Sequence, residues 1–162
     1  MLKPEYDDEG FSILTADRFV SLVWRAGPTE SRVAKVEVVL DRFVRKHPGA
    51  FGVLVVAGES ASLPSGAVRE QIVGVLRKTT PFVKSVAWVV PSEGFQGSLV
   101  RSLFTALFLM LRPSFKPRAF QSMKDGLAYV LDGIGNADAS YRTALTVEIE
   151  ASLRQVRSAA VG

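Results

Sequence analysis

The chain has 162 residues, of which 48% are hydrophobic and 22% charged, so it fits one globular domain with a core of its own. Cysteine is absent, which excludes disulfides, thiolate metal sites and a cysteine nucleophile. The net charge is +4, but the basic residues are scattered and never form a run of five, so we expect no specific binding of nucleic acid.

The N-terminal segment MLKPEYDDEG is acidic and polar, so we expect a flexible leader at residues 1–10 and no signal peptide. Asp7, Asp8 and Glu9 are interpreted as a solvated run, because a metal ion needs ligands that converge and are held rigidly. The longest apolar stretch, residues 99–111, is shorter than the ~20 residues that span a bilayer. We therefore expect a cytoplasmic protein without a transmembrane segment.

Five segments have the pattern of strands. Residues 11–15 (FSILT) alternate apolar and polar side chains, and residues 19–24 (FVSLVW) follow closely, so a hairpin is expected. Residues 51–57 (FGVLVVA) and 82–90 (FVKSVAWVV) are nearly continuous apolar runs, which favour strands covered on both faces, as in a parallel sheet. Residues 117–121 predict a short edge strand with a proline at its start.

Amphipathic segments between and after these strands predict helices. In the first, Val33, Val36, Leu40 and Phe43 recur at three- and four-residue spacing and form one apolar face, and Pro48 ends the helix. The first expected helix follows a cap at Thr29 or Ser31 and ends at residues 47–49, and the second begins near Ser65 or Gly66 and stops at residues 79–81. The third covers about residues 98–111, the fourth runs from the cap Ser122 to Leu131, and the last covers about residues 137–159.

The predicted order is ββαβαβαβα with an additional C-terminal helix. It indicates an α/β fold with a mixed, mostly parallel sheet, across which right-handed crossovers place the helices. We expect an α/β domain at residues 11–133 and a C-terminal helical extension at residues 134–162. The extension either packs back on the core or pairs with another chain.

This order resembles the STAS domain in its SpoIIAA-like form, also described as STAS/SEC14-like. The resemblance covers roughly residues 11–133. It is closest at FVKSVAWVV and in the ending RAF followed by SMKDGLAYVL, where Tyr129 stands at the place expected for a tryptophan. It implies a non-enzymatic regulatory or scaffolding domain that acts through protein contacts. The alternative that it implies is a carrier or sensor of a small apolar or lipid-like ligand.

Ser65 matches the serine that is phosphorylated in the anti-sigma-factor antagonist branch of that family, at the start of the helix after the second core strand. A phosphate there would meet free backbone amides and the positive end of the helix dipole. Pro64 stands where that branch prefers aspartate. The alternative interpretation is an N-cap serine in a polar loop.

The third predicted helix is more apolar than a helix that covers one face of a sheet needs to be. Its polar stripe comprises only Ser98, Arg101, Ser102 and Thr105, and Leu109 interrupts it. Large exposed apolar patches are usually interaction sites, so we expect something to cover this helix. The candidates are the C-terminal helix, which is the simplest, a second subunit or an apolar ligand.

Two hypotheses use this helix. In the first, it forms one surface with the C-terminal helix, and Phe104, Phe108, Leu145 and Ile149 contact a protein partner or the second copy of a homodimer. In the second, an apolar ligand lies beneath the helix. The residues expected to form this interaction or ligand surface are Trp88, Arg101, Phe104, Phe108, Leu109 and Arg112, with Arg101 or Arg112 at a polar head group.

Catalytic groups are scarce in the sequence. His47 is the only histidine and cysteine is absent, so no histidine-cysteine metal cluster is possible, and no Ser-His-Asp set stands in a predicted loop. We therefore expect neither an enzyme nor a metal or other cofactor. Arg112, Lys116 and Arg118 gather around one predicted turn, where an anionic group could bind.

Overall fold

A six-stranded sheet runs through the computed structural model, which describes residues 1–48, 50–91 and 93–159. Its strands are β1 (Lys3–Asp7), β2 (Phe11–Ala16), β3 (Phe19–Trp24), β4 (Phe51–Ala57), β5 (Val83–Val89) and β6 (Arg118–Phe120). They lie side by side in the order of the sequence. The pairs β1–β2 and β2–β3 are antiparallel, whereas β3–β4, β4–β5 and β5–β6 are parallel. The expected α/β class with a mixed sheet is confirmed.

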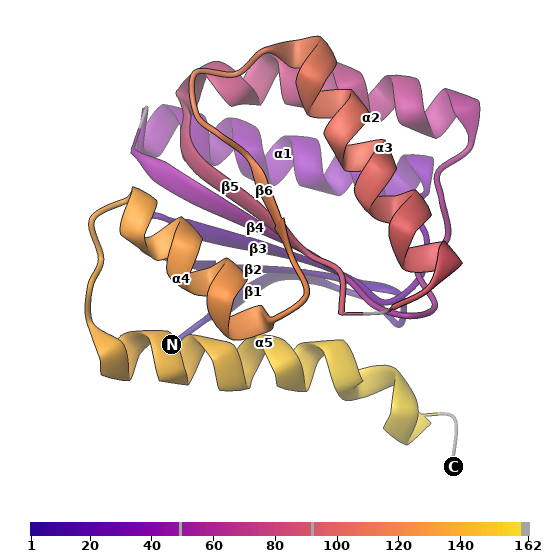
Figure 1. The fold of residues 1–162 in the computed structure, drawn as a ribbon. Helices are drawn as coiled ribbons and strands as arrows, with labels where there is room; N and C mark the ends of the chain where they lie inside the picture. Colours follow the sequence, from indigo (N-terminus) through magenta and orange to yellow (C-terminus); the bar gives the residue numbers. More distant parts are fainter. Residues whose placement is uncertain (49, 92, 160–162) are drawn as a thin grey trace.

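The helices cover both faces of this sheet (Figure 1). They are α1 (Glu30–Lys46), α2 (Gly66–Thr79), α3 (Phe95–Leu111), α4 (Met123–Gly133) and α5 (Ala139–Ala159), with a 3-10 turn η1 (Thr80–Phe82) after α2. The three crossovers between parallel strands advance in one direction along the sheet and share one hand, so α1, α2 and α3 lie on the same face. The other face is covered by α4 and α5.

The flexible leader expected at residues 1–10 is wrong, because this segment contains strand β1. It pairs with β2 over a register that runs from Lys3 opposite Thr15 to Asp7 opposite Ser12. The half-buried Tyr6 packs against Phe11 with the ring centroids 6.0 Å apart. Pairing and packing thus order a segment whose composition looks like that of a solvated tail.

The C-terminal segment packs back on the core, one of the two arrangements expected for it. Leu145 and Ile149 of α5 are both 0% exposed and belong to one core with Phe19 and Val23 of β3. Residues 160–162 of the expected extension lie outside the described residues. The helix therefore completes the second face of the sheet.

Glycines let α4 lie close to the sheet. A Cβ atom at Gly126 would lie 2.4 Å from Cγ2 of Val89, and one at Gly133 would lie 2.4 Å from Cβ of Ser85. Protein interiors are close-packed, so neither position has room for a larger residue without a shift of the helix. The core between the sheet and α4 is filled at these points, in contrast to the core beneath α3.

Candidate functional site: an apolar cavity beneath α3

Helix α3 stands off the sheet because aromatic rings lie between them. The Cα atoms of α4 come within 8 Å of those of β4 and β5, whereas the α3 backbone comes this close mainly to α2. The indole of Trp88 on β5 stacks on Phe104 and Phe108 of α3, with centroid distances of 5.3 and 5.4 Å. These rings act as spacers at one end of the helix, and smaller side chains further along leave a space.

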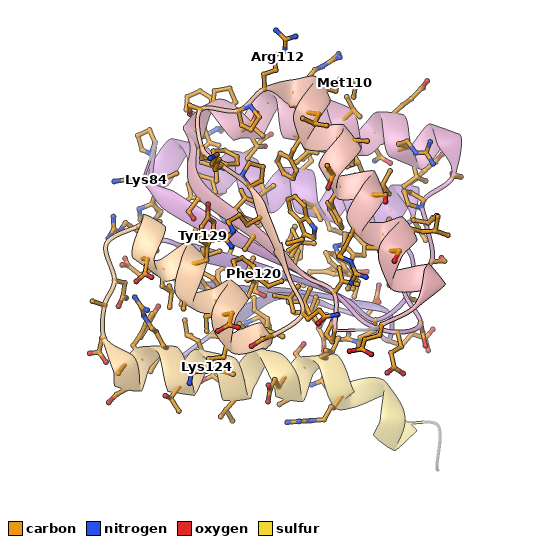
Figure 2. All side chains as sticks on the ribbon, in the orientation of Figure 1. Lys84, Met110, Arg112, Phe120, Lys124 and Tyr129 are labelled. Carbon is orange, nitrogen blue, oxygen red and sulfur yellow. The ribbon has the colours of Figure 1, made fainter. Side chains whose placement is uncertain are left out.

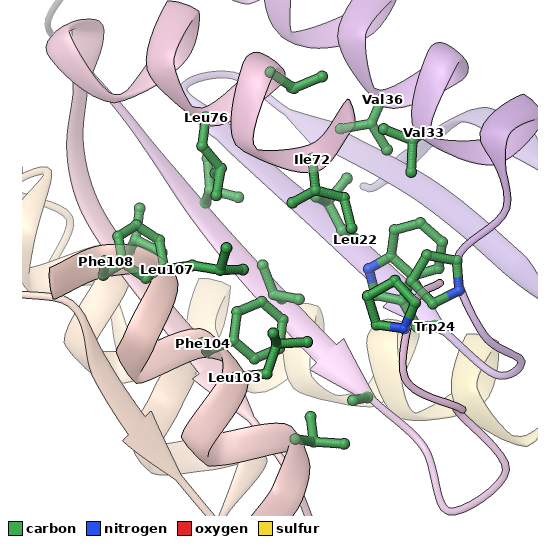
Figure 3. A pocket seen from close by; sticks show the side chains of 18 of the residues that line it. Leu22, Trp24, Val33, Val36, Ile72, Leu76, Leu103, Phe104, Leu107 and Phe108 are labelled. Atoms are coloured by element: carbon green, nitrogen blue, oxygen red, sulfur yellow. The ribbon is translucent and has the colours of Figure 1, made fainter. Parts of the chain in front are cut away.

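That space is a cavity of about 120 Å³ between the sheet and all three helices of this face. Figure 3 shows Ile72 and Leu76 of α2 and Leu103, Phe104 and Leu107 of α3 around it. The other principal lining residues are Leu22, Trp24, Val33, Val36, Leu40, Val53, Val55, Ala57, Val75, Val86, Val100 and Phe108.

The cavity offers almost no partner for a polar molecule. Ser62, Thr79 and Thr80 are the polar residues among those that line it, and the Thr79 hydroxyl already donates to the carbonyl oxygen of Val75 at 2.8 Å. A buried water needs two to four polar partners, so an apolar cavity of this kind stays dry. Engineered apolar cavities of about 150 Å³ bind benzene or xenon. A ring-sized apolar molecule therefore suits the space.

The wall formed by α2 and α3 is thin. Ile72 and Leu76 on α2 are only half-buried, as are Leu103 and Phe104 on α3. The same residues line the cavity, so the boundary between these two helices is one route from solvent. The exposed Ser62 and Leu63, which also line the cavity, mark another. Small outward displacements of α3 would open this route, because the helix makes few close backbone approaches to the sheet.

Three of the expected site residues are brought together beneath α3. Trp88 is 3% exposed and Phe108 6%, and both stack with each other, while Phe104 is half-buried. The Nε1 atom of Trp88 is buried and has no hydrogen-bond partner among the described residues. Trp88 is not among the residues that line the cavity, so this donor lies outside it.

The other three expected site residues lie on the outer surface and, like Trp88, do not line the cavity. Arg101 is half-buried, and Leu109 is 72% exposed. Arg112 adopts the left-handed conformation that ends α3, with φ at 45°, and projects away from the molecule (Figure 2). Neither guanidinium lines the cavity, so contact of Arg101 or Arg112 with the polar head group of a ligand stays a prediction. Leu109 lies eight residues after Arg101 and three before Arg112, so these three side chains share the outer face of α3.

A separate open groove lies on the outside of this corner, between α3 and β6. Leu109, Arg112 and Arg118 line it, and Phe108 contributes to both the groove and the cavity. The guanidinium of Arg118 lies over the ring of Tyr129 at 5.4 Å from the centroid. The groove thus combines an apolar base with two guanidinium groups.

The expected cover of α3 by the C-terminal helix is wrong. α5 lies on the opposite face of the sheet, where Leu145 and Ile149 are fully buried against α4 and β3. These two residues therefore form no common surface with Phe104 and Phe108. The periodicity of α5 predicts that one side of the helix is buried. It does not say against which face of the sheet, because both faces are apolar.

Ser65 is the N-cap of α2, as one of its two interpretations predicts. Its hydroxyl accepts a hydrogen bond from the backbone N–H of Val68 at 3.4 Å. The residue is exposed, and it follows the buried Pro64. Phosphorylation of Ser65 stays a prediction.

A buried arginine that the sequence analysis did not single out joins the two ends of the chain. Arg25 is 5% exposed. Its guanidinium donates to the carboxylate of Asp7 at 3.0 Å, the hydroxyl of Ser12 at 2.7 Å and the carbonyl oxygen of Ser152 at 2.9 Å. Strand β1 and helix α5 are thereby fixed to the same side chain.

The acidic residues near the N-terminus are paired, so the interpretation of Asp7 and Asp8 as part of a solvated run is wrong. Asp8 accepts hydrogen bonds from Arg32 at 3.1 Å, from the Tyr6 hydroxyl at 2.8 Å and from the backbone N–H of Gly10 at 2.7 Å. Burial alone would raise the pKa of Asp8, but these hydrogen bonds outweigh it and lower the pKa to about 2.

Within the described part of the chain, no group of three or more histidine and acidic side chains is placed to hold a metal ion. None of the described helices is both long and apolar enough to cross a bilayer. Comparisons of the chain with models of protein families, with curated proteins and with solved structures gave no significant match.

Proposed function

We propose that the protein binds a small apolar or amphipathic ligand in the cavity beneath α3, as a carrier or sensor without catalysis. The observation that carries this proposal is the apolar cavity of about 120 Å³, bounded on one side by half-buried residues of α2 and α3. Ligand sites are usually apolar concavities with few polar groups, and Ser62, Thr79 and Thr80 are the few polar residues that line this one.

The size of the cavity limits the class of ligand. Most small-molecule pockets have a volume of about 300 to 1,000 Å³, so this cavity takes a ring or a short branched chain. A longer acyl chain would require α3 to move outward. We expect a Kd on the order of 0.1 to 1 mM for a single ring, because so few atoms are buried.

The test is a titration of the purified protein with toluene, followed by methyl NMR. We expect shifts at the methyl groups of Leu103 and Leu107, which line the cavity. The methyl groups of Leu127 and Val130, in the core on the other face, should stay unmoved and serve as an internal control. Saturable shifts at the first pair alone support the proposal, and shifts at neither pair overturn it.

Mass spectrometry of an organic extract identifies what the protein carries from its host. A stoichiometric small apolar or amphipathic compound would name the ligand. A long-chain lipid at one copy per chain would show that α3 moves to enlarge the cavity.

The second candidate is the STAS-like regulatory or scaffolding function, exerted through contacts with a protein partner or in a homodimer. What favours it is that Ser65 is exposed at a helix N-terminus and that Leu109 lies open on α3. Native mass spectrometry of the wild type and of Leu109→Asp tests it. Loss of a dimer or heteromer in the variant supports this function, and a monomer in both samples counts against it.

A further inference from the structure

The charge of the protein is concentrated in the segment that forms α3 and the chain up to α4. Residues 94–124 contain no aspartate and no glutamate. Their five basic residues are Arg101, Arg112, Lys116, Arg118 and Lys124. The whole chain has 20 basic and 16 acidic residues, so everything outside this segment has a net charge of −1. The positive field of the protein therefore arises here.

Three of these basic residues flank exposed apolar side chains at one corner. Leu109 is 72% exposed and Met110 is 55% exposed, both in the last turn of α3. Arg112 follows at the end of the helix and projects outward close to Met110 (Figure 2). Lys116 and Arg118 are exposed in the connection to β6 and in β6 itself. We call these five residues the α3–β6 corner.

The geometry points to docking of the α3–β6 corner on an anionic lipid surface. Leu109 and Met110 would enter the boundary between head groups and acyl chains, and the three basic side chains would bind the lipid phosphates. A nucleic-acid backbone would bind the basic side chains but would bury no aliphatic ones. An anionic bilayer binds the basic side chains and also buries the aliphatic ones, so it is the partner that fits both features. The protein lies on the membrane in this arrangement.

This inference goes beyond the proposed ligand binding and is independent of it. Leu109, Met110 and the three basic residues are not among the residues that line the cavity beneath α3. Either property can therefore fail while the other holds. Where both hold, docking at this corner would place α3, which forms one wall of the cavity, against the lipid.

The experiment is flotation of the full chain with vesicles of phosphatidylcholine containing about 30% phosphatidylglycerol. We compare Arg112→Gln/Lys116→Gln/Arg118→Gln with the control Arg45→Gln/Lys46→Gln/Arg77→Gln, which removes three exposed charges elsewhere and leaves the same net charge. Each basic residue near an anionic surface contributes about 1 kcal/mol, or about five-fold in binding. The corner variant should therefore bind on the order of 100-fold more weakly than the control.

A second matched pair of variants tests the contribution of the apolar side chains to vesicle binding. Met110→Asp should weaken binding, whereas Val147→Asp on α5, where valine is 57% exposed, should bind like the wild type. Circular dichroism confirms that each variant is folded. Any of the following results would overturn the inference: equal binding of both triple variants, equal binding to vesicles of phosphatidylcholine alone, or a wild type that does not float with the vesicles. Equal loss of binding in Met110→Asp and Val147→Asp would also do so.

Discussion

Replacement of Ala57 with leucine tests the cavity directly. Ala57 belongs to the core beneath α3, and its side chain lines the cavity. Ala87 on the neighbouring strand provides the matched control, since it is 0% exposed and lies in the core on the opposite face, where α4 packs closely. Ala→Leu adds the same three carbon atoms at both sites, once to a cavity and once to a filled core.

The expected effects have opposite signs. A cavity costs about 24 cal/mol per Å³, so a cavity of about 120 Å³ costs about 3 kcal/mol in the ligand-free protein. Three buried carbon groups contribute up to about 2.4 kcal/mol, and some strain reduces this gain. We expect Ala57→Leu to raise the free energy of unfolding by about 1 to 2 kcal/mol. Ala87→Leu should lower it by about 1 to 3 kcal/mol through overpacking.

Urea unfolding, followed by tryptophan fluorescence, measures both values. A second readout is the Tm with toluene present. At ten times its Kd, a ligand adds about 1.4 kcal/mol and raises the Tm of the wild type by about 3 to 5 °C. This rise should disappear in Ala57→Leu and persist in a conservative surface variant. If both leucine variants lose similar stability, or if Ala57→Leu still responds to toluene, the assignment of the cavity as a ligand site is refuted.

Three further predictions concern the network near the N-terminus and the cap of α2. Arg25→Met should lower the free energy of unfolding by about 3 kcal/mol, because it strands the carbonyl oxygen of Ser152; a loss below about 1 kcal/mol in urea unfolding would contradict this. Asp8 has its pKa lowered from 3.8 to about 2, so its contribution is complete above about pH 5 and is lost as the pH falls through 2. Because the side chain of Asp8 is 28% exposed, we expect it to contribute about 1 kcal/mol to the free energy of unfolding. Asp8→Asn should therefore lose less stability than the wild type as the pH is lowered. Ser65→Ala should cost about 1 kcal/mol, and Ser65→Asp, which retains a capping oxygen, should restore most of it in the same assay.

The sequence predicts the elements that carry their own periodicity and misses those that depend on distant partners. β1 contains a proline and three charged residues, and its order depends on pairing with β2 and on the distant Arg25. No local pattern reveals that Asp7 will meet a guanidinium buried elsewhere in the fold. In contrast, the apolar runs of β4 and β5 are buried along almost their whole length, as continuous apolar sequence predicts.

The candidate site was predictable in its location and not in its shape. The excess of apolar residues in α3 correctly indicates a helix with more to cover than one sheet face. Sequence spacing puts Leu109 in the polar stripe and Phe104 and Phe108 in the apolar arc, but it does not say which of these residues face the sheet or how far the helix lies from it. That distance depends on how Trp88 stacks against both rings, which is a property of three side chains in three dimensions.

The two helix–sheet contacts on either side of β5 are built in opposite ways, and the difference has a functional consequence. Gly126 and Gly133 bring α4 so close that any side chain there would clash, so that contact has one close-packed arrangement. The contact of α3 is made through large stacked rings, with a void beside them and half-buried residues at its edge. A helix with few close backbone contacts costs less to displace than one that is fully packed. Under the proposed function, a ligand would therefore enter on the side of the sheet that carries α3, without disturbing the core that α4 and α5 hold together.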